Sequence, residues 1–263
     1  AMFDLDIFLA GGMLVLLTMT ASWLLSLRLR DASIVDINWG LGFVLLAWFY
    51  AASTPGSDPL RQALLVTTVS LWGLRLSLHI GRRNWGKGED YRYQAWRQQH
   101  GASWWWRSYL HVFLLQGLLM WIISLPLLGA LGGGPTAPTL LDGLGLAIWA
   151  VGFLFEAVGD AQLSRFRADP ANRGRLLTDG VWRYSRHPNY FGDAAQWWGL
   201  GLMAWAAGAW WTLLSPVLMT FLLLRVSGVA LLERGLTKSK PGYEDYVRRT
   251  SAFIPWPPKG EGR

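Results

Sequence analysis

The residues most capable of chemistry lie in a polar segment, 179–193, which immediately precedes an apolar stretch. This segment concentrates arginine, histidine, tyrosine, serine, asparagine and aspartate within fifteen positions. Asn189 and Asp193 are four residues apart, so on a helix beginning here both would point to the same side. Such a dense polar set between two apolar stretches is typical of a ligand-binding site.

A second polar group precedes this segment. Asp160 and Arg167 lie at the end of the preceding apolar stretch, and Arg175 follows in the connection. Guanidinium groups bind phosphates, whereas amides and carboxylates suit an amide or a ribose. The two groups together therefore predict a bound phosphorylated cofactor.

Ionisable residues also occur inside or at the ends of apolar stretches. Asp36 opens one of them, Arg75 lies within the next, and Glu156 stands four residues before Asp160. Ionisable groups in a bilayer are costly and usually face a cavity or a partner. Mutual pairing, for example of Asp36 with Arg75, is one interpretation. Functional use of some of these groups is the interpretation we favour.

Several kinds of chemistry are excluded or disfavoured. The chain has no cysteine, which excludes disulfides, thiol nucleophiles, iron–sulfur clusters and cysteine-ligated zinc. Its four histidines lack metal-ligand spacing, so no catalytic metal is expected. The Gly-x-Gly pairs beginning at Gly40, Gly143 and Gly199 lack the third glycine of a dinucleotide fingerprint and lie in apolar stretches. They indicate close helix packing instead.

The elements that must position these residues are membrane helices. Of the 263 residues, 52% are hydrophobic and only 16% are charged, which is less charge than soluble domains carry. A spanning helix needs about 20 mostly apolar residues. We predict an all-α, polytopic membrane protein with seven spans, and we expect Gly208 to lie in a tight hairpin between the last two. The predicted spans are residues 6–27, 37–53, 62–80, 107–130, 140–161, 194–207 and 209–232.

The distribution of basic residues predicts the orientation. The net charge is +7, and nearly all lysines and arginines lie in alternate connections and in the C-terminal tail. The positive-inside rule then places the N-terminus outside and the C-terminus in the cytoplasm, as an odd number of spans requires. Because the basic charge follows membrane topology, we expect membrane lipid and no nucleic acid as a partner, and we infer no obligate protein partner.

Three stretches carry a resemblance to a known family. Residues 176–193, the sequence Gly-Tyr-Glu-Asp-Tyr at 242–246 and Phe-Ile-Pro-Trp at 253–256 resemble the steroid 5-alpha-reductase family, in particular its bacterial branch. The resemblance covers about residues 150–257, with weaker stretches at 33–42 and 71–93. It implies seven membrane helices, NADPH bound from the cytoplasmic side, and reduction of the carbon–carbon double bond of 3-oxo-Δ4 steroids.

The resemblance also implies how the chain is divided. It would form a single integral membrane domain over residues 1–263, in a bacterial inner membrane. Residues 1–130 would form the substrate side, and residues 140–257 would bind the cofactor. The family is distantly related to membrane sterol reductases. A lipophilic substrate would enter this domain laterally from the bilayer.

The cofactor contacts of the family can be carried over by position. Asn189 matches the amide that meets the nicotinamide carboxamide, and Arg167 and Arg175 match phosphate partners. Tyr243 and Tyr246 match a closing tail that folds over the nucleotide. The full set implied for cofactor binding is Asp160, Arg167, Arg175, Tyr184, Arg186, His187, Asn189, Tyr190, Asp193, Glu233, Tyr243 and Tyr246.

The substrate side departs from the family pattern. Steroid reductases use a Glu and a Tyr to hydrogen-bond the substrate carbonyl. Asp36 is the candidate for the Glu, and Trp72, three residues before Arg75, stands at the position of the Tyr. Indole donates a hydrogen bond but is not an acid. A protonated Asp36 would stabilise charge on the carbonyl oxygen, and the substrate need not be a steroid.

A second enzyme class shares part of the same segment. Membrane methyltransferases of the isoprenylcysteine carboxyl and phospholipid type have an Arg-His-Pro-x-Tyr-x-Gly stretch, which residues 186–192 match. These enzymes bind S-adenosylmethionine and often carry two adjacent Glu residues where this chain has Glu233 and Arg234. A non-enzymatic lipid-binding or scaffold protein is the third interpretation. Asn189, Arg167 and Arg175 favour the phosphorylated cofactor.

Overall fold

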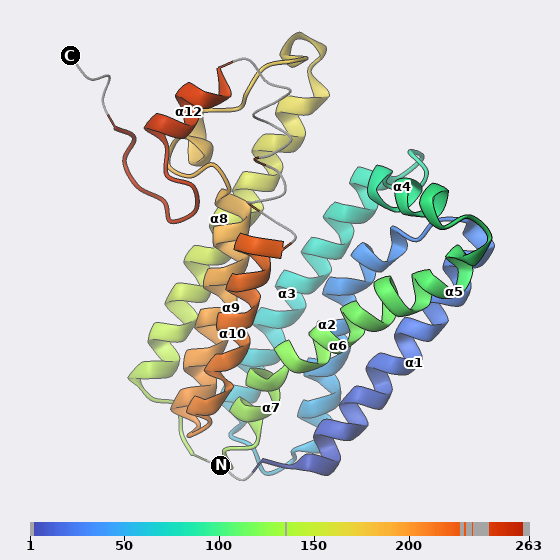
Figure 1. Ribbon diagram of the computed structural model, residues 1–263. Coiled ribbons are helices and arrows are strands. Elements are labelled where there is room, and N and C mark those ends of the chain that lie inside the picture. Colours follow the sequence, from blue (N-terminus) through green and yellow to red (C-terminus); the bar gives the residue numbers. More distant parts are fainter. Residues whose placement is uncertain (1–2, 135, 227–228, 230–232, 234–241, 260–263) are drawn as a thin grey trace. The chain divides into compact units, whose positions relative to one another are not determined.

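The computed structural model describes residues 3–134, 136–226, 229, 233 and 242–259, and within these residues all regular structure is helical (Figure 1). Five helical stretches are long and apolar enough to cross a membrane. The first three are α1, Leu5–Leu29, α2, Ile34–Ser53, and α3, Pro59–Asn84; the fourth runs over Tyr91–Leu131 and the fifth is α8, Leu140–Ala168. These helices support an integral membrane protein, and the remaining spans and the orientation stay predictions.

The chain divides into two compact units. The first comprises residues 1–142 and 203–212, and the second comprises residues 143–202 and 213–263. Each unit is built from helices that pack on one another, and each is described separately below.

In the first unit, α2 and α3 pack closely along a pair of glycines. A Cβ atom placed on Gly73 would lie 2.5 Å from the carbonyl oxygen of Gly40, so only glycine lets the two backbones approach this closely. Trp72 and Phe43 are buried in the core beside this contact, with ring centroids 5.6 Å apart. The sequence prediction that Gly40 serves close helix packing is confirmed.

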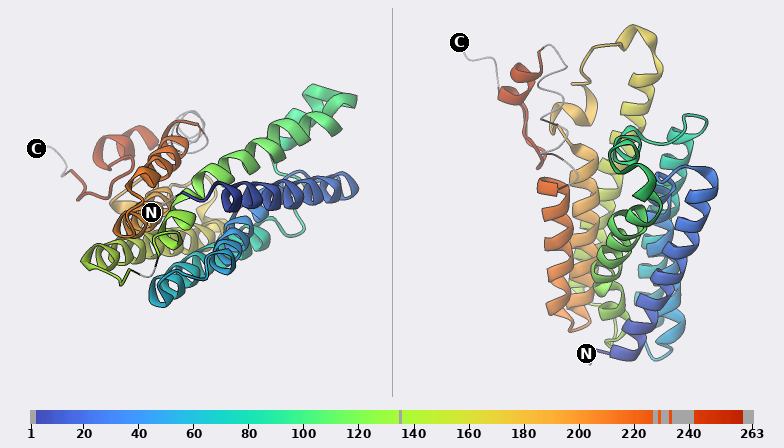
Figure 2. Two further views of the ribbon diagram at one scale, coloured as in Figure 1. Left: turned by 90° about the horizontal axis from the view of Figure 1, so that it is seen from below. Right: turned by 45° about the vertical axis from the view of Figure 1, so that its right-hand side comes forward.

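The fourth helical stretch contains interruptions. It comprises α4, Tyr91–His100, the 3₁₀ turn η1, Gly101–Ser103, α5, Trp104–Ser108, a π-helical segment η2, Tyr109–Leu114, α6, Leu115–Ile123, and α7, Leu125–Leu131. Proline in the first turn of α7 explains why that helix restarts after Ser124, since proline cannot donate a backbone hydrogen bond. Figure 2 shows α1 running alongside the α5–α6 part, with which it is in contact.

In the second unit, α8 packs against α9, Pro188–Ala206, through further glycines. A Cβ atom on Gly152 would lie 2.5 Å from the carbonyl oxygen of Gly192. A Cβ atom on Gly199 would likewise collide with the backbone of Gly145. We call this contact between α8 and α9 the α8–α9 seam. The Gly-x-Gly prediction is therefore confirmed for Gly199 as well. It is wrong for Gly143, where a Cβ atom would meet nothing within 4 Å.

Short helices complete the second unit and the turn that follows α9. They are η3, Pro170–Asn172, η4, Gly180–Arg183, α10, Leu214–Phe221, the π-helical η6, Leu222–Val226, and α12, Tyr243–Arg249, with η5 at Trp210–Leu213. The indole of Trp198 donates to the hydroxyl of Thr220 at 3.1 Å and joins α9 to α10.

Two helix boundaries bear on the sequence predictions. Helix α9 begins at Pro188, six residues before the predicted span at 194, because proline is favoured at the first helical position. Gly208 has a φ of 89° and follows the end of α9, as its predicted place in a tight hairpin requires. The amide of Ala209 donates to the carbonyl of Ala204 and that of Gly208 to Trp205, a helix-ending arrangement that favours glycine.

Candidate functional site

In the second unit, the polar segment before α9 is joined to the C-terminal residues. The hydroxyl of Ser185 donates to the carbonyl of Phe253 at 2.8 Å, and the amide of Trp256 donates to the carbonyl of Tyr184 at 2.9 Å. The hydroxyl of Tyr246 donates to the carbonyl of Trp182. The structure thus brings Tyr184 and Tyr246, which are far apart in the sequence, into one assembly. Burial raises the pKa of Tyr246.

Arg186 is buried and links the polar segment to Glu233 and to the end of α12. Its Nε lies 2.9 Å and its Nη2 2.8 Å from a carboxylate oxygen of Glu233, while Nη1 donates to the carbonyls of Val247 and Thr250 at 3.1 and 2.5 Å. Val247 lies in the last turn of α12 and Thr250 is the residue that caps it, where the helix itself offers no donors to the carbonyls. All three guanidinium nitrogens thus have protein acceptors, so Arg186 holds α12 in place.

His187 shares the carboxylate of Glu233 with Arg186. Its Nε2 lies 3.2 Å from the Glu233 oxygen, and its ring stacks on Tyr190 with centroids 5.7 Å apart. Burial lowers the pKa of His187, and Arg186 adds to this, while Glu233 partly opposes it. Burial and Glu233 raise the pKa of Tyr243 to about 12. The neutral form of both side chains is therefore favoured.

The α8–α9 seam holds a row of buried polar side chains. Asn189 donates to the carboxylate of Asp160 at 3.2 Å. Gln196, two turns later on α9, donates at 2.6 Å to Glu156, which lies one turn before Asp160 on α8. Asp193 lies on α9 between them and is 9% exposed. The helical spacing predicted for Asn189 and Asp193 is confirmed, since both belong to α9. Sequence reasoning missed Gln196, whose signal was its spacing of three residues from Asp193.

Two buried polar atoms in this region have no hydrogen-bond partner among the described residues. They are the side-chain oxygen of Gln196 and the indole nitrogen of Trp149 on α8. Buried polar groups are nearly always paired, so unpaired ones often mark a place for a water molecule or ligand. In contrast, Arg167 and Arg175, near the end of α8, are exposed to solvent.

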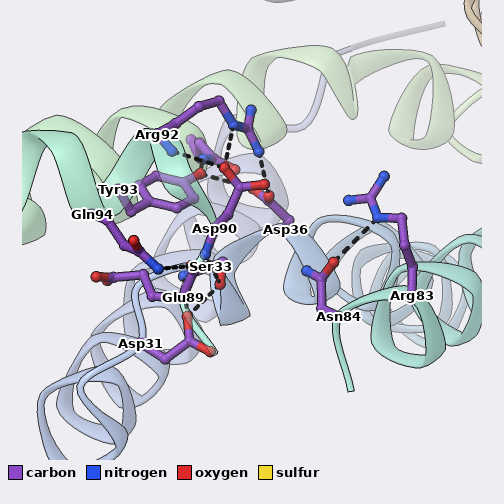
Figure 3. Close-up of polar contacts among 11 residues, drawn as sticks. Asp31, Ser33, Asp36, Arg83, Asn84, Glu89, Asp90, Arg92, Tyr93 and Gln94 are labelled. Atoms are coloured by element: carbon purple, nitrogen blue, oxygen red, sulfur yellow. Dashed lines mark hydrogen bonds and ion pairs between the residues drawn. The ribbon is translucent and has the colours of Figure 1, made fainter. Parts of the chain in front are cut away.

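In the first unit, Asp36 lies in a different polar cluster (Figure 3). One carboxylate oxygen is 2.9 Å from Nη2 of Arg92, and the other accepts a hydrogen bond from the hydroxyl of Tyr93 at 2.8 Å. The amide of Gln116 lies 3.4 Å from the same Tyr93 hydroxyl. Asp36 thus pairs with Arg92, a residue of α4, whereas the sequence had suggested Arg75.

The start of α4 is held in place by neighbouring acids. Asp90 caps the helix by accepting from the amide of Arg92 and also receives the Nε of Arg92 at 2.9 Å. Burial alone would raise the pKa of Asp90, but these hydrogen bonds outweigh it, and the pKa is lowered. Glu89 accepts two hydrogen bonds from Arg97, at 2.8 and 2.9 Å, and one from the amide of Ala32. These contacts fix Arg92 and Tyr93 against the start of α2.

The other two residues predicted for the substrate side lie on α3. Trp72 is 1% exposed and packs on Phe43 between α2 and α3, whereas Arg75 is half-buried one turn further along. Sequence reasoning missed Arg92 and Tyr93. The signal that could have found them is the Trp-Gly-Lys-Gly-Glu-Asp sequence at 85–90, whose glycines allow the chain to turn back toward α2.

Within the described ranges, no group of three or more His, Cys, Asp or Glu side chains could hold a metal ion. The two polar clusters instead offer hydrogen-bond donors and acceptors, with solvent-exposed guanidinium groups in the second unit. This chemistry suits organic ligands with amide, carbonyl or phosphate groups.

Comparison with known proteins gives one family and one relative. A family described as a protein of unknown function, DUF1295, matches residues 22–250. The chain is also similar to the uncharacterized protein C594.04c of Schizosaccharomyces pombe, with 24% identity over 277 residues that cover 94% of this chain and 79% of the relative. No solved structure matches.

Proposed function

We propose that this chain, which belongs to the DUF1295 family, is an NADPH-dependent reductase of a carbon–carbon double bond conjugated to a carbonyl in a lipophilic, steroid-like substrate. The resemblance of residues 150–257 to the steroid 5-alpha-reductase family supports this proposal. The apolar helices support a substrate that reaches the protein from the bilayer. The observation that carries the proposal is the α8–α9 seam, where Asn189 and Asp160 meet. The exposed Arg167 follows Asp160 by two turns of α8, and the exposed Arg175 lies in the next connection.

The residues of the second unit fit a phosphorylated dinucleotide. Arg167 and Arg175 are exposed and can bind phosphates, whereas Asn189 and Asp193 at the start of α9 can meet an amide or a ribose. The unpaired oxygen of Gln196 is a further acceptor in the same seam. Arg186 differs from these residues, since its nitrogens already hold α12, and we assign it a positioning role. NADPH, when bound, supplies the hydride of the reaction.

Tyr93 and Asp36 support the substrate half of the proposal. Reduction of an enone builds negative charge on the carbonyl oxygen, which a nearby donor must stabilise. Tyr93 is a phenol that already donates to Asp36 at 2.8 Å, and a phenol can release a proton where an indole cannot. We therefore assign to the Asp36–Tyr93 pair the donor role that the sequence had divided between Asp36 and Trp72. Arg92 orients the carboxylate of Asp36.

We also propose seven spans with the N-terminus outside and the C-terminus in the cytoplasm of a bacterial inner membrane. The distribution of lysine and arginine supports this orientation, which would place Arg167 and Arg175 on the cytoplasmic side, where NADPH is available. Within one membrane domain, residues 1–130 would serve the substrate and residues 140–257 the cofactor.

One observation favours a second candidate, an S-adenosylmethionine-dependent membrane methyltransferase. The Arg-His-Pro segment common to those enzymes directs Arg186 to protein acceptors, so this arginine offers no free guanidinium to a phosphate. S-adenosylmethionine carries no phosphate and would need none. The exposed Arg167 and Arg175 favour NADPH over this alternative.

The test is to titrate NADPH and S-adenosylmethionine separately against the purified protein in detergent. We expect NADPH to bind, and Asn189→Ala to abolish NADPH binding in a protein that remains folded. Thr178→Ala is the matched control, because Thr178 is exposed in the same connection. Selective binding of S-adenosylmethionine would replace the reductase by a methyltransferase. Binding of neither would leave a lipid-binding or scaffold protein.

A further inference from the structure

Three arginines lie at one end of the first unit, and the proposed reaction gives them no role. Arg28 and Arg30 lie at the end of α1 and are exposed, and Arg107 is half-buried on α5. The described residues provide no ion pair or hydrogen bond to any of the three guanidinium groups. The neighbouring acid, Asp31, accepts hydrogen bonds from the amide and hydroxyl of Ser33 instead. Asp31 offsets part of the positive charge at this end of the unit, but none of the described residues forms an ion pair with these three guanidinium groups.

Tryptophans lie beside Arg107 and between one and two helical turns before Arg28. The indole of Trp23 donates to the carbonyl of Trp105 at 2.9 Å, and its ring packs on Tyr109 with centroids 4.6 Å apart. These contacts join α1 to α5 and η2. The guanidinium of Arg107 lies over the ring of Trp106 at 4.9 Å, a cation–π contact. Arg28 follows Trp23 by five residues, which is roughly 7 Å along the helix.

The same surface changes from apolar to basic along the helices. Leu24 and Leu25 on α1 and Leu110 on η2 are exposed, as lipid-facing side chains are. Trp105 and Trp106 are 56% and 39% exposed and precede Leu110 by one to two turns. Tryptophan settles at the headgroup level of a bilayer, so Arg107, which lies over the ring of Trp106, is expected at the level of the lipid phosphates.

We propose that Arg28, Arg107, Trp23, Trp105 and Trp106 form a binding site for the headgroup of an anionic phospholipid, the tryptophan–arginine site. The charge decides the class of lipid. An anionic headgroup presents a phosphate without a compensating cation, whereas the choline of a zwitterionic lipid would be repelled by the same guanidinium groups. The acyl chains would lie on the exposed leucines of α1 and η2.

The experiment is native mass spectrometry of the full-length protein in detergent, with phosphatidylglycerol and phosphatidylcholine of identical acyl chains. We expect the wild type to retain phosphatidylglycerol preferentially. Arg107→Gln should lower this retention about fivefold, and removing Arg28 as well should lower it further. Lys87→Gln is the matched control, because it removes one exposed positive charge from the connection between α3 and α4 rather than from α1 or α5. Arg107→Lys should lie between the wild type and Arg107→Gln, since the ammonium keeps the charge.

Three results would overturn the proposal. Equal retention of both lipids would show that the protein does not distinguish the headgroups by their charge. Equal losses in Lys87→Gln and Arg107→Gln would show that only the total charge matters. Inorganic phosphate that binds in the absence of lipid, with the same dependence on Arg107, would reassign the site to a soluble anion. Melting temperatures of the variants distinguish a lost site from a lost fold, and none of these measurements depends on the proposed reductase activity.

Discussion

At the level of single residues, Asp36 lies in surroundings that suit the role proposed for it, in place of the Glu of the steroid 5-alpha-reductases that the sequence resembles. Its carboxylate lies in α2 and is reached by two consecutive residues of α4, Arg92 and Tyr93. Tyr93 is 4% exposed and Asp36 is also largely shielded from water. A phenol held away from solvent can stabilise negative charge on a substrate oxygen when its O–H turns from Asp36 to that oxygen, while Arg92 balances the charge of the Asp36 carboxylate.

Tyr93→Phe tests this pair. The change removes one hydroxyl and keeps the ring that packs on Trp96. We expect NADPH-dependent turnover of an enone to fall by about 10²-fold or more, the usual contribution of a positioned acid, with NADPH affinity unchanged. The measurement is NADPH oxidation in detergent. Tyr91→Phe on the same helix is the control, because Tyr91 is 72% exposed, and wild-type turnover in Tyr93→Phe would contradict the assignment.

His187 makes the stability of the second unit depend on pH. Burial lowers the pKa of His187 in the folded protein, whereas in the unfolded chain the pKa is the ordinary value of about 6.5. At pH values between the two, the unfolded chain binds a proton at His187 and the folded protein does not. The free energy of unfolding should therefore fall as the pH is lowered from about 7.5 to about 5.5, by at most about 1.4 kcal/mol per pH unit.

Thermal unfolding of His187→Gln measures this effect. The variant should lose the pH dependence that His187 contributes, while His111→Gln, which changes an exposed histidine of the first unit, should keep it. An identical pH dependence in the wild type and in His187→Gln would show that the buried imidazole is not the group responsible.

At the level of elements, glycines determine how closely the helices approach. Gly152 and Gly192 let α8 and α9 meet backbone to backbone, and this closeness brings Asn189 within hydrogen-bond distance of Asp160 and Gln196 within reach of Glu156. The candidate cofactor site therefore depends on residues that have no side chain. Gly40 and Gly73 do the same for α2 and α3.

Gly192→Ala should destabilise the protein. The new Cβ would lie 2.5 Å from the backbone nitrogen of Glu156, and overpacking of this kind costs about 1–3 kcal/mol. Gly143→Ala on α8 is the matched control, because a Cβ there meets nothing within 4 Å and alanine favours the helix by up to about 1 kcal/mol. Melting temperatures in detergent compare the two, and equal stability would contradict the proposed role of the seam.

At the level of the whole molecule, the one basic residue in the predicted outer connections has a structural explanation. Arg61 is 1% exposed and forms two hydrogen bonds with Asp142, at 2.8 and 3.0 Å, and others with the carbonyls of Thr136 and Ala137. A buried, paired arginine does not act as a topological signal in the way that exposed loop charges do. Arg61 is therefore compatible with the positive-inside assignment.

The absence of native cysteine makes this orientation directly measurable. Gly56→Cys lies in the predicted outer connection between α2 and α3, and Thr178→Cys lies in the predicted cytoplasmic connection before α9; both positions are exposed. With a membrane-impermeant maleimide, we expect Gly56→Cys to react in intact cells whose outer membrane has been permeabilised. Thr178→Cys should react only after lysis, and the opposite pattern would reverse the topology.

The sequence by itself determined the helices, the membrane setting and the spacing of Asn189 and Asp193. These features depend on apolar stretches and helical periodicity, which are local properties of the chain. It also indicated that Gly40 and Gly199 serve helix packing, because glycines inside apolar helices commonly allow close helix contacts.

Only the tertiary structure decided which polar groups meet. Tyr93 reaches Asp36 across 57 positions, and Arg186 reaches Glu233 across 47. Pairing of Asp36 with Arg75 was one interpretation of the sequence, and the fold pairs Asp36 with Arg92. The fold also turns Arg186 toward α12, and its predicted contact with a cofactor stays a prediction. The physical reason is that a charged side chain in an apolar surrounding must be paired, but any of several partners would satisfy it. The packing of the helices decides which of these partners lies within reach.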